Sequence, residues 1–178
     1  MLRGLWKLWA SKRAAAAIEF AIVVPIILFL FAGIVEFGRI FQVYVATNRL
    51  ATQFAIAWAD CSDSPAGTCQ TELNAYSASY TIANIAPQLS FTPPNSFTLT
   101  MFEVQMSGTT PTIVYSYPAS QTLTPAQTTV AQANFASGQT GVIVTASYVH
   151  SLDFFSVLMT PLLGTLLAPT YTVAQLKS

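Results

Sequence analysis

The chain has 178 residues, of which 53% are apolar and only 8% charged, and its seven basic and seven acidic residues give a formal net charge of zero. After Arg39 the only basic residues are Arg49 and Lys177, so the sequence lacks the clustered positive charge that nucleic-acid binding requires. This composition fits a membrane-anchored or exported domain better than a cytosolic enzyme.

One stretch near the N-terminus is apolar enough to cross a membrane. Between Ala14 and Val35 the only charged residue is Glu19, and a helix of about 22 residues is roughly 33 Å long, enough for a bilayer core. Four basic residues precede it, and the positive-inside rule then predicts a cytoplasmic N-terminus: Arg3, Lys7, Lys12 and Arg13. We expect a leader over residues 1–14, a transmembrane helix over 15–38 and an exported domain over 39–178.

Glu19 is the exception within this apolar stretch. A carboxylate inside a membrane helix costs on the order of 3 kcal/mol, so it needs either a shallow position or a partner. In one interpretation Glu19 extends to the cytoplasmic headgroups and pairs with Lys12 or Arg13. In the other, its partner belongs to a neighbouring chain.

The residues around Glu19 favour the second interpretation. A basic pair is followed by a run of small residues from Ala14 to Ala17, then Ile18, Glu19, Phe20 and a long apolar run. This order resembles the class III leader of type IV prepilins, and specifically the TadE-like pseudopilins of the tight-adherence (Flp, type IVc) pilus system.

Later residues extend the resemblance. Pro25 in the apolar run, the Gly33–Arg39 segment GIVEFGR and, more weakly, the C-terminal GVIVTASYVHSLDFF and PLLG segments are similar to the family pattern. The resemblance implies cleavage between Ala14 and Ala15 by a prepilin peptidase, with Ala14 standing where the family usually has Gly. Glu19 would then be the fifth residue of the mature chain.

The resemblance also implies a function and partners. It implies a non-catalytic minor pseudopilin of pilus assembly, held in the bacterial inner membrane with its C-terminal domain in the periplasm, and possibly incorporated in a pilus. Its partners would be other pilins and pseudopilins through the N-terminal helix, the peptidase, the assembly platform and membrane lipid. Glu19 and Phe20 would act in assembly, Glu19 by pairing with the new Ala15 ammonium of a neighbouring protomer.

The helical pattern continues beyond the apolar stretch. At about 100° per residue, Gln42, Arg49, Gln53 and Asp60 lie on one side, and neither Gly nor Pro interrupts the chain between Arg39 and Ser64. The opposite side is mostly apolar, and comprises Ile40, Tyr44, Ala51, Ala55 and Trp58. We therefore predict one helix of about 45 residues whose outer half is amphipathic and carries the exported domain.

Cys61 and Cys69 are the only cysteines, and they flank the turn-rich septet SDSPAGT. In an exported compartment this spacing predicts a disulfide that closes a small loop. A metal or redox pair is disfavoured because the spacing is not C-x-x-C and His150 is the only histidine.

The rest of the chain predicts an α+β domain. A second helix is expected over 71–85, and a short helix over 125–135 inside the loop of residues 118–141. Alternating, β-branched and aromatic sequence predicts four strands, over 96–106, 112–117, 142–149 and 170–176. The apolar segment 153–167 would cap the core or lie on the membrane. We expect a pilin-like arrangement, a long helix packed on a three- or four-stranded antiparallel sheet.

The sequence contains no recognisable catalytic constellation, cofactor motif or metal-ligand cluster, and we expect no enzyme activity, no cofactor and no small-molecule substrate. His150 is interpreted as structural. Two alternatives to the pseudopilin remain. One is a membrane-tethered adhesin or ligand-binding module, and the other is a soluble secreted protein cut after Ala32.

Overall fold

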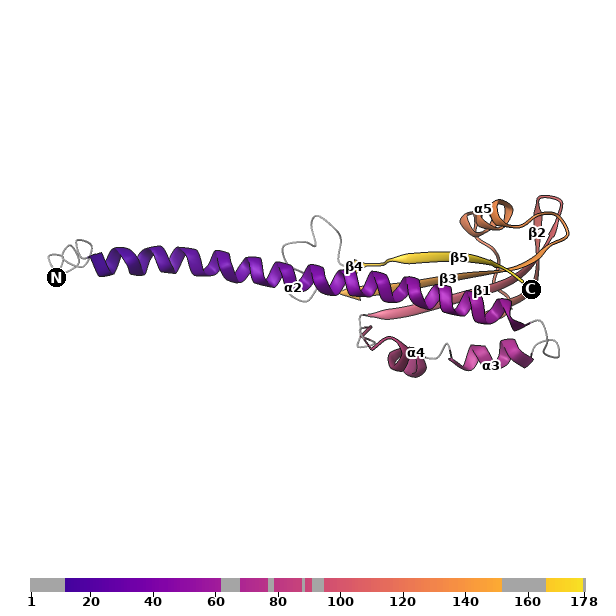
Figure 1. The fold of residues 1–178 in the computed structure, drawn as a ribbon, viewed down its shortest axis with the longest axis horizontal. Helices are drawn as coiled ribbons and strands as arrows, with labels where there is room; N and C mark the ends of the chain where they lie inside the picture. Colours follow the sequence, from indigo (N-terminus) through magenta and orange to yellow (C-terminus); the bar gives the residue numbers. More distant parts are fainter. Residues whose placement is uncertain are drawn as a thin grey trace.

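The computed structural model describes residues 12–61, 68–76, 79–87, 89–90, 95–151 and 166–177. Within them lie one long helix, three short helices and an antiparallel sheet (Figure 1). The predicted α+β class, a long N-terminal helix packed on a small antiparallel sheet, is confirmed.

The long helix α2 spans Lys12–Ala59, 48 residues, and is therefore about 72 Å long. Up to Gln42 its described side chains are exposed or partly exposed, with Glu36 as the buried exception. From Val43 onward, buried residues recur every three or four positions, as on one face of an amphipathic helix: Val43, Ala46, Thr47, Leu50, Ala51, Phe54, Ala55, Trp58 and Ala59. The outer half of α2 thus packs on the domain, and the inner half projects from it as a rod (Figure 1).

The predicted polar and apolar sides of the outer half are largely confirmed. The four polar residues, Gln42, Arg49, Gln53 and Asp60, are all exposed. Among the apolar set, Ala51, Ala55 and Trp58 are fully buried, whereas Ile40 and Tyr44 remain partly exposed because they lie near the edge of the domain. Thr47 tolerates complete burial because its hydroxyl donates to the carbonyl oxygen of Val43 at 2.8 Å.

Two short helices follow, α3 (Thr68–Tyr76) and α4 (Ser79–Ile85), and they lie alongside the outer half of α2 (Figure 1). The prediction of a single helix over 71–85 was wrong, because the structure has two separate helices there. The segment is rich in Ser, Thr, Tyr and Asn, which are weak helix formers, so tertiary packing decides its shape. Each piece contributes an apolar residue to the core beneath α2, Leu73 from α3 and Ile82 from α4.

The sheet is built from β1 (Ser96–Ser107), β2 (Thr110–Tyr117), β3 (Thr140–Ser151), β4 (Leu166–Leu167) and β5 (Thr170–Leu176). Its order is β2-β1-β3-β4, with β5 also paired to β3, and all pairs are antiparallel. The pairing of β3 with β4 continues in the same register into its pairing with β5, so these two strands form one interrupted edge. All four predicted strands are confirmed.

The two faces of the sheet carry different cores. On the α2 face, Leu99 and Met101 of β1 and Val142, Val144, Ala146 and Tyr148 of β3 pack against the buried stripe of α2. On the opposite face a smaller cluster forms beneath the helix α5 (Pro125–Asn134): Phe102, Val104, Met106, Ala131, Phe135 and Ile143. Strand alternation explains the division, because successive side chains point to opposite faces.

The helix α5 confirms the short helix predicted within the loop. Thr124 caps it, since its hydroxyl accepts from the Gln127 backbone N–H at 3.3 Å while the Gln127 Oε1 accepts from the Thr124 N–H at 2.9 Å. At its other end the ring of Phe135 lies where a side chain at Gly141 would project, so a Cβ there would overlap the ring. This close approach joins α5 to the start of β3.

Candidate functional site

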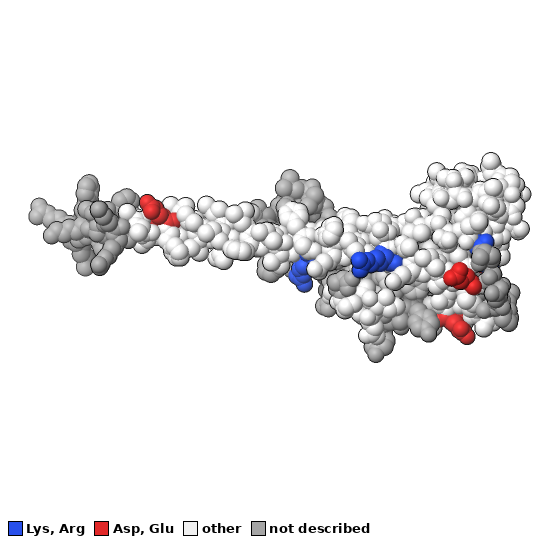
Figure 2. Space-filling view, viewed as in Figure 1, with Lys and Arg blue, Asp and Glu red and all other residues white. Residues whose placement is uncertain are grey.

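The exposed inner half of α2 carries most of the large exposed apolar side chains of the described chain. It is the one helix there that is long and apolar enough to cross a membrane, and none of its most apolar window is buried. Large side chains such as Phe20 (70% exposed) and Phe41 (69% exposed) project from it. Figure 2 shows this rod as almost free of charged side chains between its ends. A soluble surface rarely exposes so large an apolar area, which indicates contact with lipid or with other apolar helices.

The length of this segment agrees with a membrane span. From Ala15 to Gln42, before the domain core begins at Val43, the helix extends about 42 Å, whereas a bilayer core is about 30 Å thick. The two headgroup layers together add about 10 to 15 Å to that core, so a helix of this length reaches across the whole bilayer and would hold the domain at the membrane surface.

The predicted assembly residues lie together at the start of this segment. Ala14 and Ala15 belong to the first turns of α2, and Glu19 follows about one turn later with its side chain exposed. Phe20 is exposed beside it. Ala15, Glu19 and Phe20 are therefore on the surface of a single continuous helix, where another chain can reach the carboxylate of Glu19.

The predicted disulfide is present. Cys61 and Cys69 are bonded, with their Cα atoms 5.6 Å apart, and they connect the second residue after the end of α2 to the first turn of α3. Cys61 is 3% exposed, so the bond also covers the end of the core. Its position indicates a structural rather than a redox role.

His150 lies near the end of β3 and is 6% exposed. Its ring is stacked on that of Tyr148, with centroids 6.1 Å apart and an interplanar angle of 24°. The described residues contain no group of three or more His, Cys, Asp or Glu side chains that could hold a metal ion. His150 thus belongs to the packed interior of the domain.

One group of residues was missed in the sequence. Thr98 and Thr100, Thr145 and Ser147, and Thr170 and Thr172 come from three strands and lie together on the sheet face opposite α2. The only signal in the sequence was a Thr or Ser at alternate positions of each strand. Without the strand register, nothing indicated that the three pairs are neighbours.

Comparison with known proteins bears on the N-terminal segment alone. The family model described as TadE-like protein matches residues 14–55, which comprise nearly all of α2. No curated protein and no solved structure matches the chain. The match begins at Ala14, includes Glu19 and Phe20, and ends within the part of α2 that packs on the sheet. Over residues 14–55 this chain is therefore similar to the TadE-like family.

Proposed function

We propose that the protein is a non-catalytic minor pseudopilin of a tight-adherence pilus system, anchored in the inner membrane by α2. The observation that carries the proposal is the exposed apolar rod of α2, which has Glu19 near its start and lies within the TadE-like match of residues 14–55. The N-terminus lies in the cytoplasm, since Arg3, Lys7, Lys12 and Arg13 precede the span. The sheet and the short helices then lie in the periplasm.

In this proposal Glu19 is an assembly contact. A prepilin peptidase cuts between Ala14 and Ala15 on the cytoplasmic side, which leaves a positively charged amine four residues before Glu19. Packed against a second protomer, Glu19 pairs with the amine at Ala15 of that neighbour, and each charge is neutralised inside the apolar layer. The small residues from Ala15 to Ala17 allow the helices to approach closely at this level.

The partners follow from the same surface. Other pilins and pseudopilins pack along the rod of α2, the peptidase reads the segment around Ala14 and Glu19, and the assembly platform receives the anchored subunit. The peptidase cuts before the apolar run, so the span stays attached to the domain. The helix α2 therefore remains available for packing against other subunits after export.

Processing is tested by producing the full chain with and without a prepilin peptidase and measuring the intact mass and N-terminal sequence of the membrane fraction. We expect the loss of residues 1–14 and a new terminus at Ala15. Ala14→Leu should block the cut because the side chain at the cleavage position becomes bulky, whereas Ala14→Gly should be cut at least as well. An unprocessed wild-type chain in the presence of an active peptidase would overturn the processing step.

Assembly is tested separately with Glu19→Gln, which removes the charge and keeps the size. Membrane insertion should be retained or improved, while pilus formation in a strain that depends on this subunit should fall strongly. The matched control is Glu72→Gln, an exposed acid on α3 far from the rod, which should leave pili unchanged. Normal pilus numbers with Glu19→Gln would remove the proposed assembly contact.

A further inference from the structure

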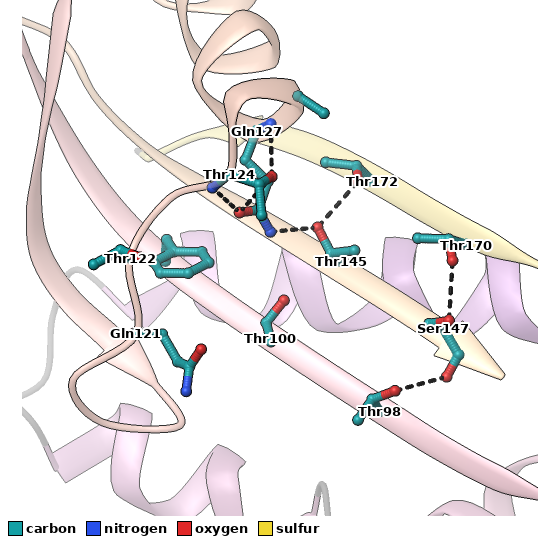
Figure 3. A pocket seen from close by; sticks show the side chains of 12 residues that line it. Thr98, Thr100, Gln121, Thr122, Thr124, Gln127, Thr145, Ser147, Thr170 and Thr172 are labelled. Atoms are coloured by element: carbon teal, nitrogen blue, oxygen red, sulfur yellow. Dashed lines mark hydrogen bonds between the residues drawn. The ribbon is translucent and has the colours of Figure 1, made fainter. Parts of the chain in front are cut away.

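A groove lies on the sheet face opposite α2, between the strands and the segment that leads into α5 (Figure 3). Its volume is about 310 Å³, at the lower end of the range for small-molecule sites. The sheet contributes six hydroxyl side chains in two rows across three strands. The first row is Thr98, Ser147 and Thr170, and the second is Thr100, Thr145 and Thr172. We call these six residues the hydroxyl grid.

The strand register fixes the spacing of the hydroxyl grid. Thr100 pairs with Thr145, and Thr145 pairs with Thr172, so members of one row stand on directly opposed positions. Neighbouring strands are about 4.8 Å apart, and residues two apart along a strand are about 6.7 Å apart. The grid is therefore a regular array of hydroxyl and methyl groups.

Within the described residues, the hydrogen bonds of the second row use only one of its two paired threonine hydroxyl hydrogens. The Thr145 and Thr172 hydroxyl oxygens are 3.0 Å apart and share one hydrogen, while Gln127 Nε2 donates to Thr145 Oγ1 at 2.9 Å. Whichever threonine donates, the hydrogen of the other is left over. In the first row, Thr170 Oγ1 donates to Ser147 Oγ at 2.9 Å, and the described part of the chain supplies no acceptor for the hydrogen of Ser147.

The side chain of Gln127 is held in a fixed position at the groove by hydrogen bonds. The residue is 5% exposed, and its Oε1 is held by the backbone N–H and the hydroxyl of Thr124 at 2.9 and 3.1 Å. Its Nε2 carries two hydrogens, and the described residues supply an acceptor only for the one bound to Thr145. The capping residues of α5 thus anchor a buried amide at the edge of the hydroxyl grid (Figure 3).

The chemistry of the lining selects the class of ligand. The groove is lined by eight hydroxyl side chains, two carboxamides, Phe102 and Ala126, and none of these ionises near neutral pH. An anionic or cationic ligand would lose its hydration without gaining an opposite charge. Threonine offers a hydroxyl and a methyl side by side, which matches a molecule whose surface alternates hydroxyl and C–H groups.

We propose that this groove is a binding site for a neutral carbohydrate. The hydroxyl grid and Gln127 form hydrogen bonds with the sugar hydroxyls, and the threonine methyls contact its C–H faces. An extended peptide is a poorer fit, because peptides add to the edge of a sheet and this groove lies on its face. The site does not depend on the pilus role, since α2 packs on the other face and leaves the groove open.

The test uses the full chain in phospholipid nanodiscs, which contain no sugar detergent, with threonine methyl groups labelled for NMR. Maltose, lactose and N,N′-diacetylchitobiose are the probes, and digalacturonic acid is the charged comparison. With at least one neutral disaccharide we expect saturable shifts of the Thr98, Thr100, Thr145 and Thr172 methyl signals. The signals of Thr52 and Thr112, which lie outside the groove, should not move.

Thr100→Val tests the role of the hydroxyl at almost constant shape. Within the described residues the Thr100 hydroxyl makes no hydrogen bond, so its removal should leave the sheet intact while affinity falls about tenfold. Ala126→Phe should abolish binding by filling the groove, and Thr112→Val on β2 is the matched control that should bind normally. Unchanged affinity in Thr100→Val, or no saturable groove shift with any of the three neutral sugars, would overturn the proposal.

Discussion

The ammonium of Lys177, near the C-terminus, lies 2.7 Å from a carboxylate oxygen of Glu103 in the centre of the sheet. The Glu103 side chain is 8% exposed and that of Lys177 19% exposed. The ion pair runs from the end of β5 across β3 to β1, and the Lys177 backbone N–H also donates to the Thr140 carbonyl at 3.1 Å. The last residues of the chain thus hold the strands together.

Lys177→Met should lower the free energy of unfolding by about 2 kcal/mol, because the buried carboxylate of Glu103 loses its ion pair. Thermal unfolding followed by circular dichroism measures the effect, and Arg49→Met, on the exposed side of α2, is the control that should stay within about 0.5 kcal/mol of wild type. A double-mutant cycle with Glu103→Gln should give a clear coupling energy. Additive effects would show that the two residues act independently.

Gly141→Ala should destabilise the domain by about 1 to 3 kcal/mol, because the new methyl overlaps the Phe135 ring and that ring is packed in the smaller core. The comparison is Gly38→Ala in α2, where the added methyl meets nothing within 4 Å and should be neutral or stabilising. Combining Gly141→Ala with Phe135→Leu should recover part of the loss. Equal melting temperatures for Gly141→Ala and wild type would contradict the close approach.

Reduction of the Cys61–Cys69 bond should lower the free energy of unfolding by about 2.5 kcal/mol, the chain-entropy estimate for so short a loop. The double variant Cys61→Ser/Cys69→Ser should have the same stability with and without dithiothreitol, while the melting temperature of the wild type should fall on reduction. A wild-type protein insensitive to the reductant would indicate that the loop adds nothing to stability.

The orientation of the anchor can be read from a single cysteine. Thr109→Cys, in the exposed turn between β1 and β2, should react with a membrane-impermeant maleimide added to intact spheroplasts, because the proposed orientation places the sheet outside the inner membrane. The native cysteines are bonded to each other and should stay silent. Labelling that requires permeabilised cells would reverse the proposed orientation.

Much of the fold could be predicted because the hydrophobic periodicity of its long helix and its strands is strong. The buried positions of α2 recur every three or four residues up to Trp58, and the strands alternate, as in TYTVAQL of β5. The boundary between α3 and α4 could not be predicted, since neither helix has a long apolar period and both depend on packing against α2. The segment 153–165 and the leader residues 1–11 lie outside the described residues, and their roles stay predictions.

The candidate sites also differ in how far they could be predicted from the sequence. Glu19 and Phe20, and Cys61 and Cys69, are close in sequence, so local order was enough to single them out. The hydroxyl grid depends on register: Thr98 and Thr170 are brought into one row by strands that are far apart in the chain. Alternation showed which face each threonine occupies, whereas pairing between strands determines its neighbours.

The continuity of α2 has a mechanical consequence. The helix that contains the candidate span also carries Leu50 and Trp58 into the core. It is a single helix from Lys12 to Ala59, so no loop separates the span from the core. A helix of this kind transmits torque as well as tension, so turning its exposed inner half by some angle turns the sheet by about the same angle. In the proposed pilus subunit, the direction in which the groove over the hydroxyl grid points would then be set by how neighbouring helices pack against α2.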